Sequence, residues 1–184
     1  MTGAAVSAWL RERRGLKAFR PLWQLAVLNV DDRLALDPSG AGLRLVSVRF
    51  TLHRWVVEIL DGMRVLRAWS SPEAAKTIRR HAHASPLPLS AAERQAVMTA
   101  AVLRDAHLRL QAARGTEGSS RPPPPLPPDA TVLALLGEDT AAADERARLL
   151  LVAAHLNHPL TDSSLAELRT TSPSTAGRPP ASAR

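Results

Sequence analysis

Residues 49–69 read RFTLHRWVVEILDGMRVLRAW, and this stretch decides the fold class. Its apolar residues, taken with the residue before it, recur mainly at steps of three and four, which is the spacing of one helix face. They are Val48, Leu52, Trp55, Val56, Ile59, Met63 and Leu66. The pattern predicts an amphipathic helix. Asp61-Gly62 leaves two alternatives open, a break of that helix or a β-hairpin, because Asp-Gly is a turn dipeptide.

The composition favours packed helices throughout the chain. The 184 residues are enough for one domain, and aromatic residues make up only 3%, so Leu, Val and Ala must form the core. Cysteine is absent, which excludes disulfides, thiol catalysis and Cys-ligated zinc. No apolar run approaches the roughly 18 residues of a membrane span, and no signal peptide is visible, so we expect a cytoplasmic location.

Turn, cap and proline residues divide the chain into four parts. We predict a helical core over residues 7–114, a Pro-rich linker over 115–129, a C-terminal helical segment over 130–158 that packs back on the core, and a disordered tail over 159–184.

Helix signals locate the elements inside these parts. The expected helices are Ser7 to Arg14 ending near Gly15, one starting at Pro21, the residue 49–69 stretch, one opening at Ser70-Ser71-Pro72, one opening with the capping box Ser90 to Glu93, and Ala141 to Asn157. The prediction is therefore an all-α bundle of five or six helices with the 49–69 helix at its centre.

A set of motif residues resembles a known family. These residues are Arg20, Pro21, Leu22, Trp23, Arg54, Val56, Val57, Glu58, Ile59, Asp61, Gly62, Leu66 and Arg67. Over about residues 8–158 the chain is similar to a cytoplasmic helical domain of unknown function from actinobacterial proteins. That domain usually follows membrane-spanning helices, in proteins labelled as transporters without an established substrate. The chain departs from the pattern at Leu60 and at Ala68-Trp69. The resemblance implies a stand-alone version of a tethered domain, and it carries over no catalytic residue.

Arg54, Glu58 and Asp61 are the strongest candidates for chemistry. They lie at i, i+4 and i+7, on one side of the predicted helix. One interpretation is a paired-carboxylate acid–base site, and the other is a charged network that fixes helix packing. The four tryptophans have a similar pair of interpretations, as anchors of a core or interface or as platforms for nucleic-acid bases.

The net charge of +7 resides in the first half of the chain, where residues 1–80 hold 14 basic and 7 acidic side chains. A basic patch there consists of Arg11, Arg13, Arg14 and Lys17, followed by Arg20. It is interpreted as a relic of a membrane-proximal position, a lipid-surface contact or a phosphate contact. His155 and His158 share a helix face, but no metal-site or phosphate-loop motif accompanies them, so no metal and no cofactor is predicted.

These observations predict a non-enzymatic regulatory or protein-interaction module with an unidentified protein partner. Two alternatives remain open: a nucleic-acid-binding protein that uses the basic N-terminal half, and an enzyme that uses Glu58 and Asp61.

Overall fold

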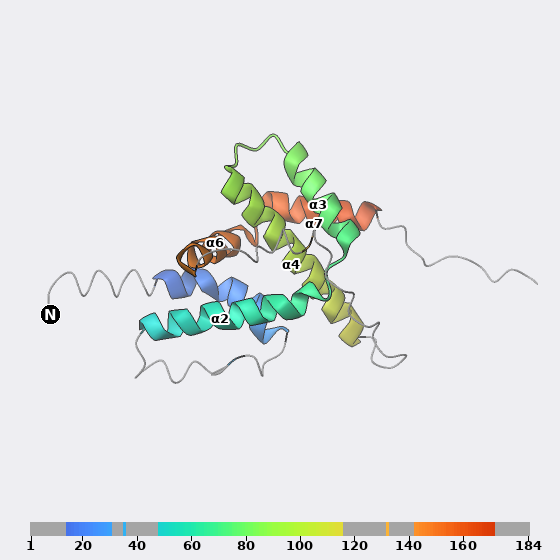
Figure 1. The fold of residues 1–184 in the computed structure, drawn as a ribbon. Helices are drawn as coiled ribbons and strands as arrows, with labels where there is room; N and C mark the ends of the chain where they lie inside the picture. The colour runs from blue at the N-terminus through green and yellow to red at the C-terminus, as the bar shows by residue number, and fades with distance from the viewer. Residues whose placement is uncertain (1–13, 31–34, 36–47, 116–131, 133–141, 172–184) are drawn as a thin grey trace, which may run out of the picture.

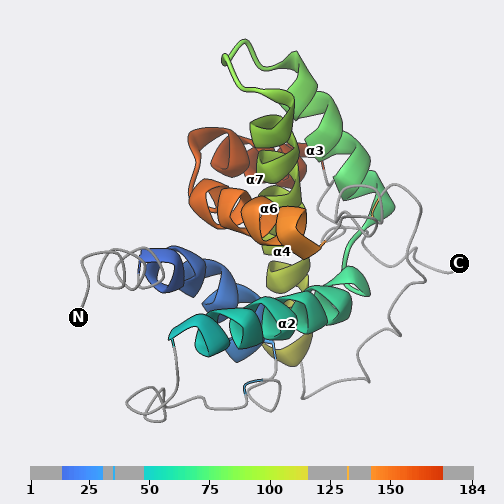
Figure 2. The same ribbon diagram turned by 60° about the vertical axis from the view of Figure 1, so that its left-hand side comes forward.

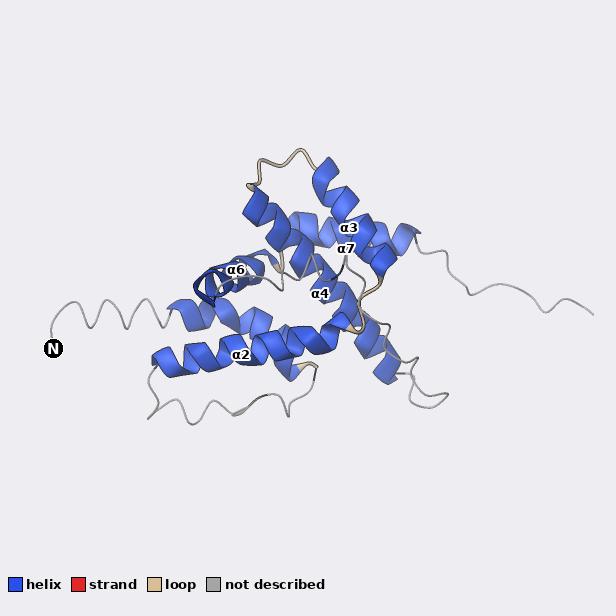
Figure 3. Ribbon diagram, in the orientation of Figure 1, coloured by secondary structure: helices blue, strands red, loops and turns tan. Residues whose placement is uncertain are grey.

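The computed structural model describes residues 14–30, 35, 48–115, 132 and 142–171 (Figure 1). In these ranges the secondary structure is helical and no strand occurs (Figure 3). The elements are η1 (Gln24–Leu28), α2 (Val48–Arg67), α3 (Pro72–Ala84), α4 (Ala91–Gly115), α6 (Ala142–His155) and α7 (Pro159–Thr171). The predicted all-α fold is confirmed.

The centre of the bundle is α4. It contacts η1, α2, α3, α6 and α7, and Figure 1 shows it running between them. Residues 96–103 of α4 are all buried, so this section of the helix is covered on every side. The prediction that the 49–69 helix forms the centre is therefore wrong. The alanines of α4 let neighbouring helices approach from all directions, whereas α2 keeps an exposed side.

The N-terminal helix differs from its prediction. Residues 14–23 are α-helical and continue directly into η1, so neither the end near Gly15 nor the start at Pro21 is correct. The η1 turn is π-helical, with Asn29 N–H donating to the carbonyl of Gln24 at 3.1 Å. Pro21 lacks the N–H that an α-helical hydrogen bond needs, and the regular helix changes to π geometry three residues later. The rest of the Ser7 to Arg14 prediction lies outside the described residues.

The N-terminal helix and α2 run side by side (Figures 1 and 2). A Cβ on Gly15 would lie 3.7 Å from Leu52, and Ala26 lies beside Gly62, so both helices advance in the same direction. The α2 helix continues through Asp61-Gly62 to Arg67, which confirms the helix and excludes both the break and the hairpin.

Side-chain caps set the starts of α3 and α4. Ser71 Oγ accepts from the Ala74 N–H at 3.3 Å, and Pro72 occupies the first turn of α3. The predicted capping box is confirmed at α4, where Glu93 N–H donates to Ser90 Oγ at 3.2 Å and Ser90 N–H donates to Glu93 Oε2 at 2.9 Å.

Residues 159–171 form α7, so this part of the predicted disordered tail is wrong. Pro159 acts as a first-turn residue of a new helix instead of ending the previous one. The α7 helix buries Leu160, Leu165 and Leu168 and packs on α3 and α4. The linker residues 116–129 and the tail residues 172–184 lie outside the described residues.

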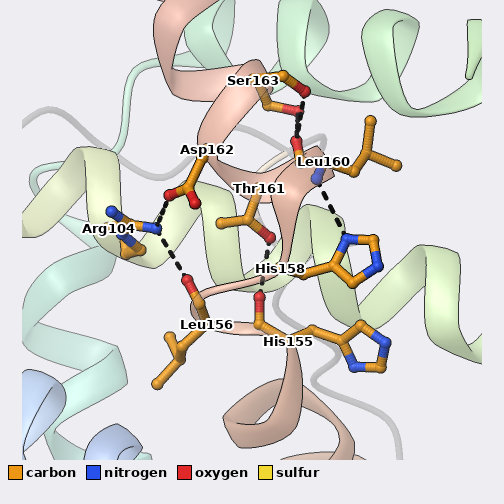
Figure 4. Close-up of polar contacts among 9 residues, drawn as sticks. Arg104, His155, Leu156, His158, Leu160, Thr161, Asp162 and Ser163 are labelled. Atoms are coloured by element: carbon orange, nitrogen blue, oxygen red, sulfur yellow. Dashed lines mark hydrogen bonds and ion pairs between the residues drawn. The ribbon is translucent and has the colours of Figure 1, made fainter.

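The α6–α7 junction is tied to the central helix (Figure 4). Arg104 of α4 donates to the carbonyl of Leu156 at 2.9 Å and pairs with Asp162 Oδ1 at 2.5 Å. Thr161 Oγ donates to the carbonyl of His155 at 2.9 Å. Since α6 also packs on α4, the segment after the linker becomes part of the bundle.

Candidate functional site

A buried polar centre joins the N-terminal helix to α2. Trp23 Nε1 donates to Glu58 Oε2 at 2.6 Å, and Arg54 Nε lies 3.3 Å from Glu58 Oε1 as an ion pair. Trp23 is 6% exposed and Glu58 is 4% exposed. The Trp55 ring stacks on Trp23 with centroids 4.9 Å apart and planes inclined by 12°. The carboxylate is thus shared between an indole donor and a guanidinium in a site that excludes most water.

The helical repeat of α2 explains this arrangement. Arg54, Trp55 and Glu58 fall within about one turn, so α2 presents the Trp55 ring and the Glu58 carboxylate to Trp23 while Arg54 reaches Glu58 along its own helix, at the edge of the polar centre. A buried carboxylate costs much free energy unless it is paired and hydrogen-bonded, and here both conditions are met. The polar centre therefore specifies how the two helices are aligned.

Gly62 allows the two backbones to come unusually close. A Cβ at this position would lie 1.9 Å from the Ala26 carbonyl oxygen and 2.6 Å from its carbonyl carbon. Any side chain would require the backbone of η1 to move. Gly62 is thus a packing residue, and its place in the family-like motif has a steric reason.

Glu58 and Asp61 face different partners. Asp61 Oδ1 pairs with Arg64 at 2.6 Å on the exposed side of α2, where their side chains are 44% and 69% exposed, respectively. Glu58 points inward to Trp23 and Arg54. In the described part of the chain the two carboxylates contact different partners, so the geometry does not support a paired acid–base site.

The remaining predicted site residues lie apart from the polar centre. Arg20 and Pro21 are exposed on the N-terminal helix, and Arg67 is half-buried at the end of α2. Arg14 and Lys17 of the basic patch are exposed, whereas Arg11 and Arg13 lie outside the described residues. The structure therefore unites Trp23, Arg54, Glu58 and Gly62 between the two helices, and it leaves Arg20, Pro21 and Arg67 on the surface or at a helix end.

Sequence reasoning missed an exposed apolar surface on α2. Phe50 is 59% exposed, Val57 45% and Val65 40%. We call these three residues, together with Asp61 and Arg64 between them, the outer face of α2. Phe50 and Val57 are seven residues, or about two turns, apart, so their spacing already indicated a second apolar line on this helix.

The histidine pair makes local contacts. The rings of His155 and His158 have centroids 5.3 Å apart, and His155 Nδ1 lies 2.8 Å from the carbonyl oxygen of Leu151. The Leu160 N–H donates to His158 Nδ1 at 3.2 Å (Figure 4). Within the described ranges no cluster of three or more His, Cys, Asp or Glu residues could hold a metal ion. In the same ranges, no helix combines the length and the apolar character needed to cross a bilayer.

Comparison with known proteins gives one match. The model of a family of unknown function, DUF6545, matches residues 8–158. No curated protein and no solved structure matches the chain. The matched range covers most of the 184 residues and includes both helices of the polar centre. The chain therefore belongs to DUF6545, a family of unknown function.

Proposed function

We propose that this chain is a non-enzymatic protein-interaction module that docks a protein partner on the outer face of α2. The observation that carries the proposal is the clustering of exposed apolar side chains. Of the five large apolar side chains that are exposed in the described part of the chain, Phe50, Val57 and Val65 lie on α2. Grouped apolar side chains on one helix are a common feature of binding surfaces.

The surroundings of these side chains fit a docking surface. Asp61 and Arg64 lie among them and are exposed, so the outer face combines apolar anchors with charges of both signs. Apolar burial supplies binding energy, while charges at the rim select a partner and its orientation. On its other side α2 is held by η1, α4 and the polar centre, which gives the surface a rigid support.

The same geometry argues against the enzyme alternative. Glu58 is engaged by Trp23 and Arg54, and Asp61 is engaged by Arg64. Neither carboxylate is presented beside the other for proton transfer. Trp23 and Trp55 are not part of the outer face of α2, because Trp23 is buried and Trp55 stacks on it.

Nucleic-acid binding is the second candidate, and it rests on the N-terminal helix. Arg14, Lys17 and Arg20 are spaced three residues apart and all are exposed, so they line one side of that helix. Phosphate contacts from such a line would make binding weaken steeply with added salt.

The family resemblance supports two further parts of the proposal. We propose that the chain comes from an actinobacterium and that it lies in the cytoplasm, in peripheral contact with a membrane.

Affinity capture from the native cells tests the two candidates. Tagged wild-type chain is compared with the Phe50→Glu, Val57→Glu double variant and with Leu108→Glu, which alters an exposed apolar residue of α4. We expect a stoichiometric protein partner that resists nuclease and is lost only with the double variant. If all three chains recovered the protein partner equally, the outer face of α2 would not be its docking surface. Recovery of nucleic acid, with proteins lost after nuclease treatment, would favour the basic helix.

A further inference from the structure

We infer that the partner on the outer face of α2 is a second copy of this chain, with the two α2 helices packed antiparallel about a two-fold axis at Val57. This inference rests on the proposed function and names the partner of the same surface. A two-fold interface requires a surface that is complementary to itself. The order of side chains along α2 meets that requirement.

The apolar residues match when α2 is laid against a reversed copy. With the axis between positions 57 and 58, position 50 faces position 65. Phe50 then lies opposite Val65 of the second copy, at both ends of the contact. Val57 lies next to its own counterpart at the axis. All three side chains are at least 40% exposed, so they are accessible to a partner.

The charges match in the same register. Position 54 faces position 61, so Arg54 lies opposite Asp61 of the second copy. These residues are seven apart, which is close to two whole turns, so they project from nearly the same side of the helix. A two-fold axis across an antiparallel pair brings like sides together, and Arg54 therefore meets an acidic side chain. Asp61 is 44% exposed, and Arg54 keeps 18% of its side chain exposed while it pairs with Glu58.

A parallel pair of α2 helices does not give this match of side chains. A parallel pair would place each residue beside its own copy, so Asp61 would face Asp61 and Arg64 would face Arg64. Like charges at contact distance oppose association, whereas the antiparallel register pairs opposite charges. The contact uses one helix face and falls in the small class of interfaces, so we expect a reversible dimer with a dissociation constant in the micromolar range.

Sedimentation equilibrium over a range of concentrations measures the association. The wild-type chain, of 19.8 kDa, is expected to shift from monomer to twice that mass. Phe50→Glu is expected to weaken dimerisation at least about tenfold, because the substitution places a charge opposite Val65. Leu108→Glu serves as the matched control and should leave the association unchanged, since Leu108 is 47% exposed but lies on α4. Circular dichroism verifies that each variant remains folded.

Cysteine cross-linking tests the position of the axis. The chain has no cysteine, so Val57→Cys introduces a single thiol at the proposed axis. Under mild oxidation it should form a covalent dimer at least about tenfold faster than Leu108→Cys, because the two thiols are held together in the dimer. The exposures of Val57 and Leu108 are 45% and 47%, which makes the two probes comparable.

The results separate this inference from the proposed function. A wild-type chain that stays monomeric up to about 1 mM, a dimer unaffected by Phe50→Glu, or equal cross-linking of the two cysteine variants would each overturn the α2 pairing. If the chain is monomeric and the native capture still yields another protein that depends on Phe50 and Val57, the interaction module stands with a different partner. A dimer that is lost in Phe50→Glu and trapped rapidly through Val57→Cys supports the inference.

Discussion

Two regions of the molecule are held together in different ways. The N-terminal pair, which consists of residues 14–30 and α2, is joined by a buried indole–carboxylate hydrogen bond and by direct backbone approach at Gly62. The α4 group, which consists of α3, α4, α6 and α7, is joined by Ala, Val and Leu burial. The ion pair between Arg104 and Asp162, one of its polar contacts, lies near the surface.

The comparison distinguishes contacts that fix a single alignment of two helices from contacts that stabilise the fold by apolar burial. Contacts in the N-terminal pair exist in one alignment only, because a shift along the helices would leave Glu58 without its donor and bring side chains against Ala26. Apolar packing in the α4 group depends mainly on volume and tolerates substitutions of similar size. We therefore expect conservative changes to cost more in the first region than in the second.

The largest expected effect is that of Gly62→Ala. In most helices this change stabilises by about 1 kcal/mol. Here the new Cβ meets the Ala26 carbonyl, and we expect a loss of about 3 kcal/mol in the free energy of unfolding. Urea denaturation followed by circular dichroism measures it. Gly115→Ala is the control, because nothing lies within 4 Å of its added Cβ. If the two variants had the same free energy of unfolding, close backbone approach at Gly62 would not distinguish the N-terminal pair from the α4 group.

Trp23→Phe comes next. The substitution keeps an aromatic ring but removes the indole N–H that donates to the buried carboxylate of Glu58. We expect a loss of about 2 kcal/mol. Trp55→Phe, at the other ring of the stack, should cost less because it removes no donor to that carboxylate. If the two losses were the same, stacking instead of the hydrogen bond would dominate. A double-mutant cycle with Glu58→Gln measures the coupling directly.

Met98→Leu tests the tolerance of the α4 group. Met98 is 4% exposed within the fully covered section of α4, and the change nearly preserves volume. We expect a loss of no more than about 1 kcal/mol. The same denaturation series measures it beside Gly62→Ala. A loss as large as that of Gly62→Ala would show that packing in both regions is equally specific.

The smallest effect is a pH dependence at the start of α4. Hydrogen bonds from the Ser90 side chain and backbone lower the pKa of Glu93 below its usual 4.5. The charged form therefore stabilises the folded state above pH 4.5, and this contribution is lost as the pH falls through the lowered folded value. The stability difference between wild type and Glu93→Gln should narrow below pH 4.5. A Ser90→Ala background should reduce that narrowing, and an unchanged pH profile there would contradict the capping mechanism.

Local signals in the sequence predicted much of the helical framework. Ser71 and the Ser90–Glu93 box act through backbone groups within three residues, so the starts of α3 and α4 could be read directly. The apolar spacing of α2 was equally informative. The α7 helix was missed because Pro159 can either follow a helix or begin one, and the choice depends on whether Leu165 and Leu168 find a surface to cover.

Non-local contacts explain what the sequence did not predict. Trp23 and Glu58 are 35 residues apart, and nothing in the intervening chain indicates that they meet. The central position of α4 depends on where its neighbours pack, which helical spacing does not encode. At the candidate site, Arg54, Glu58 and Asp61 were grouped on one side of the predicted helix. Arg54 does lie beside Glu58, but Asp61 pairs with Arg64 on the exposed side, a direction that follows from the placement of η1 on the opposite side.

The π-helical turn accommodates one extra residue in the N-terminal helix. Its hydrogen bonds span five residues instead of four, so η1 behaves as an α-helix that has accepted one inserted residue. Trp23 anchors the chain before the turn, and the Asn29 carbonyl is bound after it by Gln111 and Arg114 of α4. Deleting one residue between these anchors is therefore expected to convert the turn to α-helical geometry and to leave both anchors in place. A further inserted residue has no such outlet and would rotate everything after it by about 100°. Related chains that keep both anchors are therefore expected either to keep this length or to lose one residue between positions 23 and 29, but not to gain one.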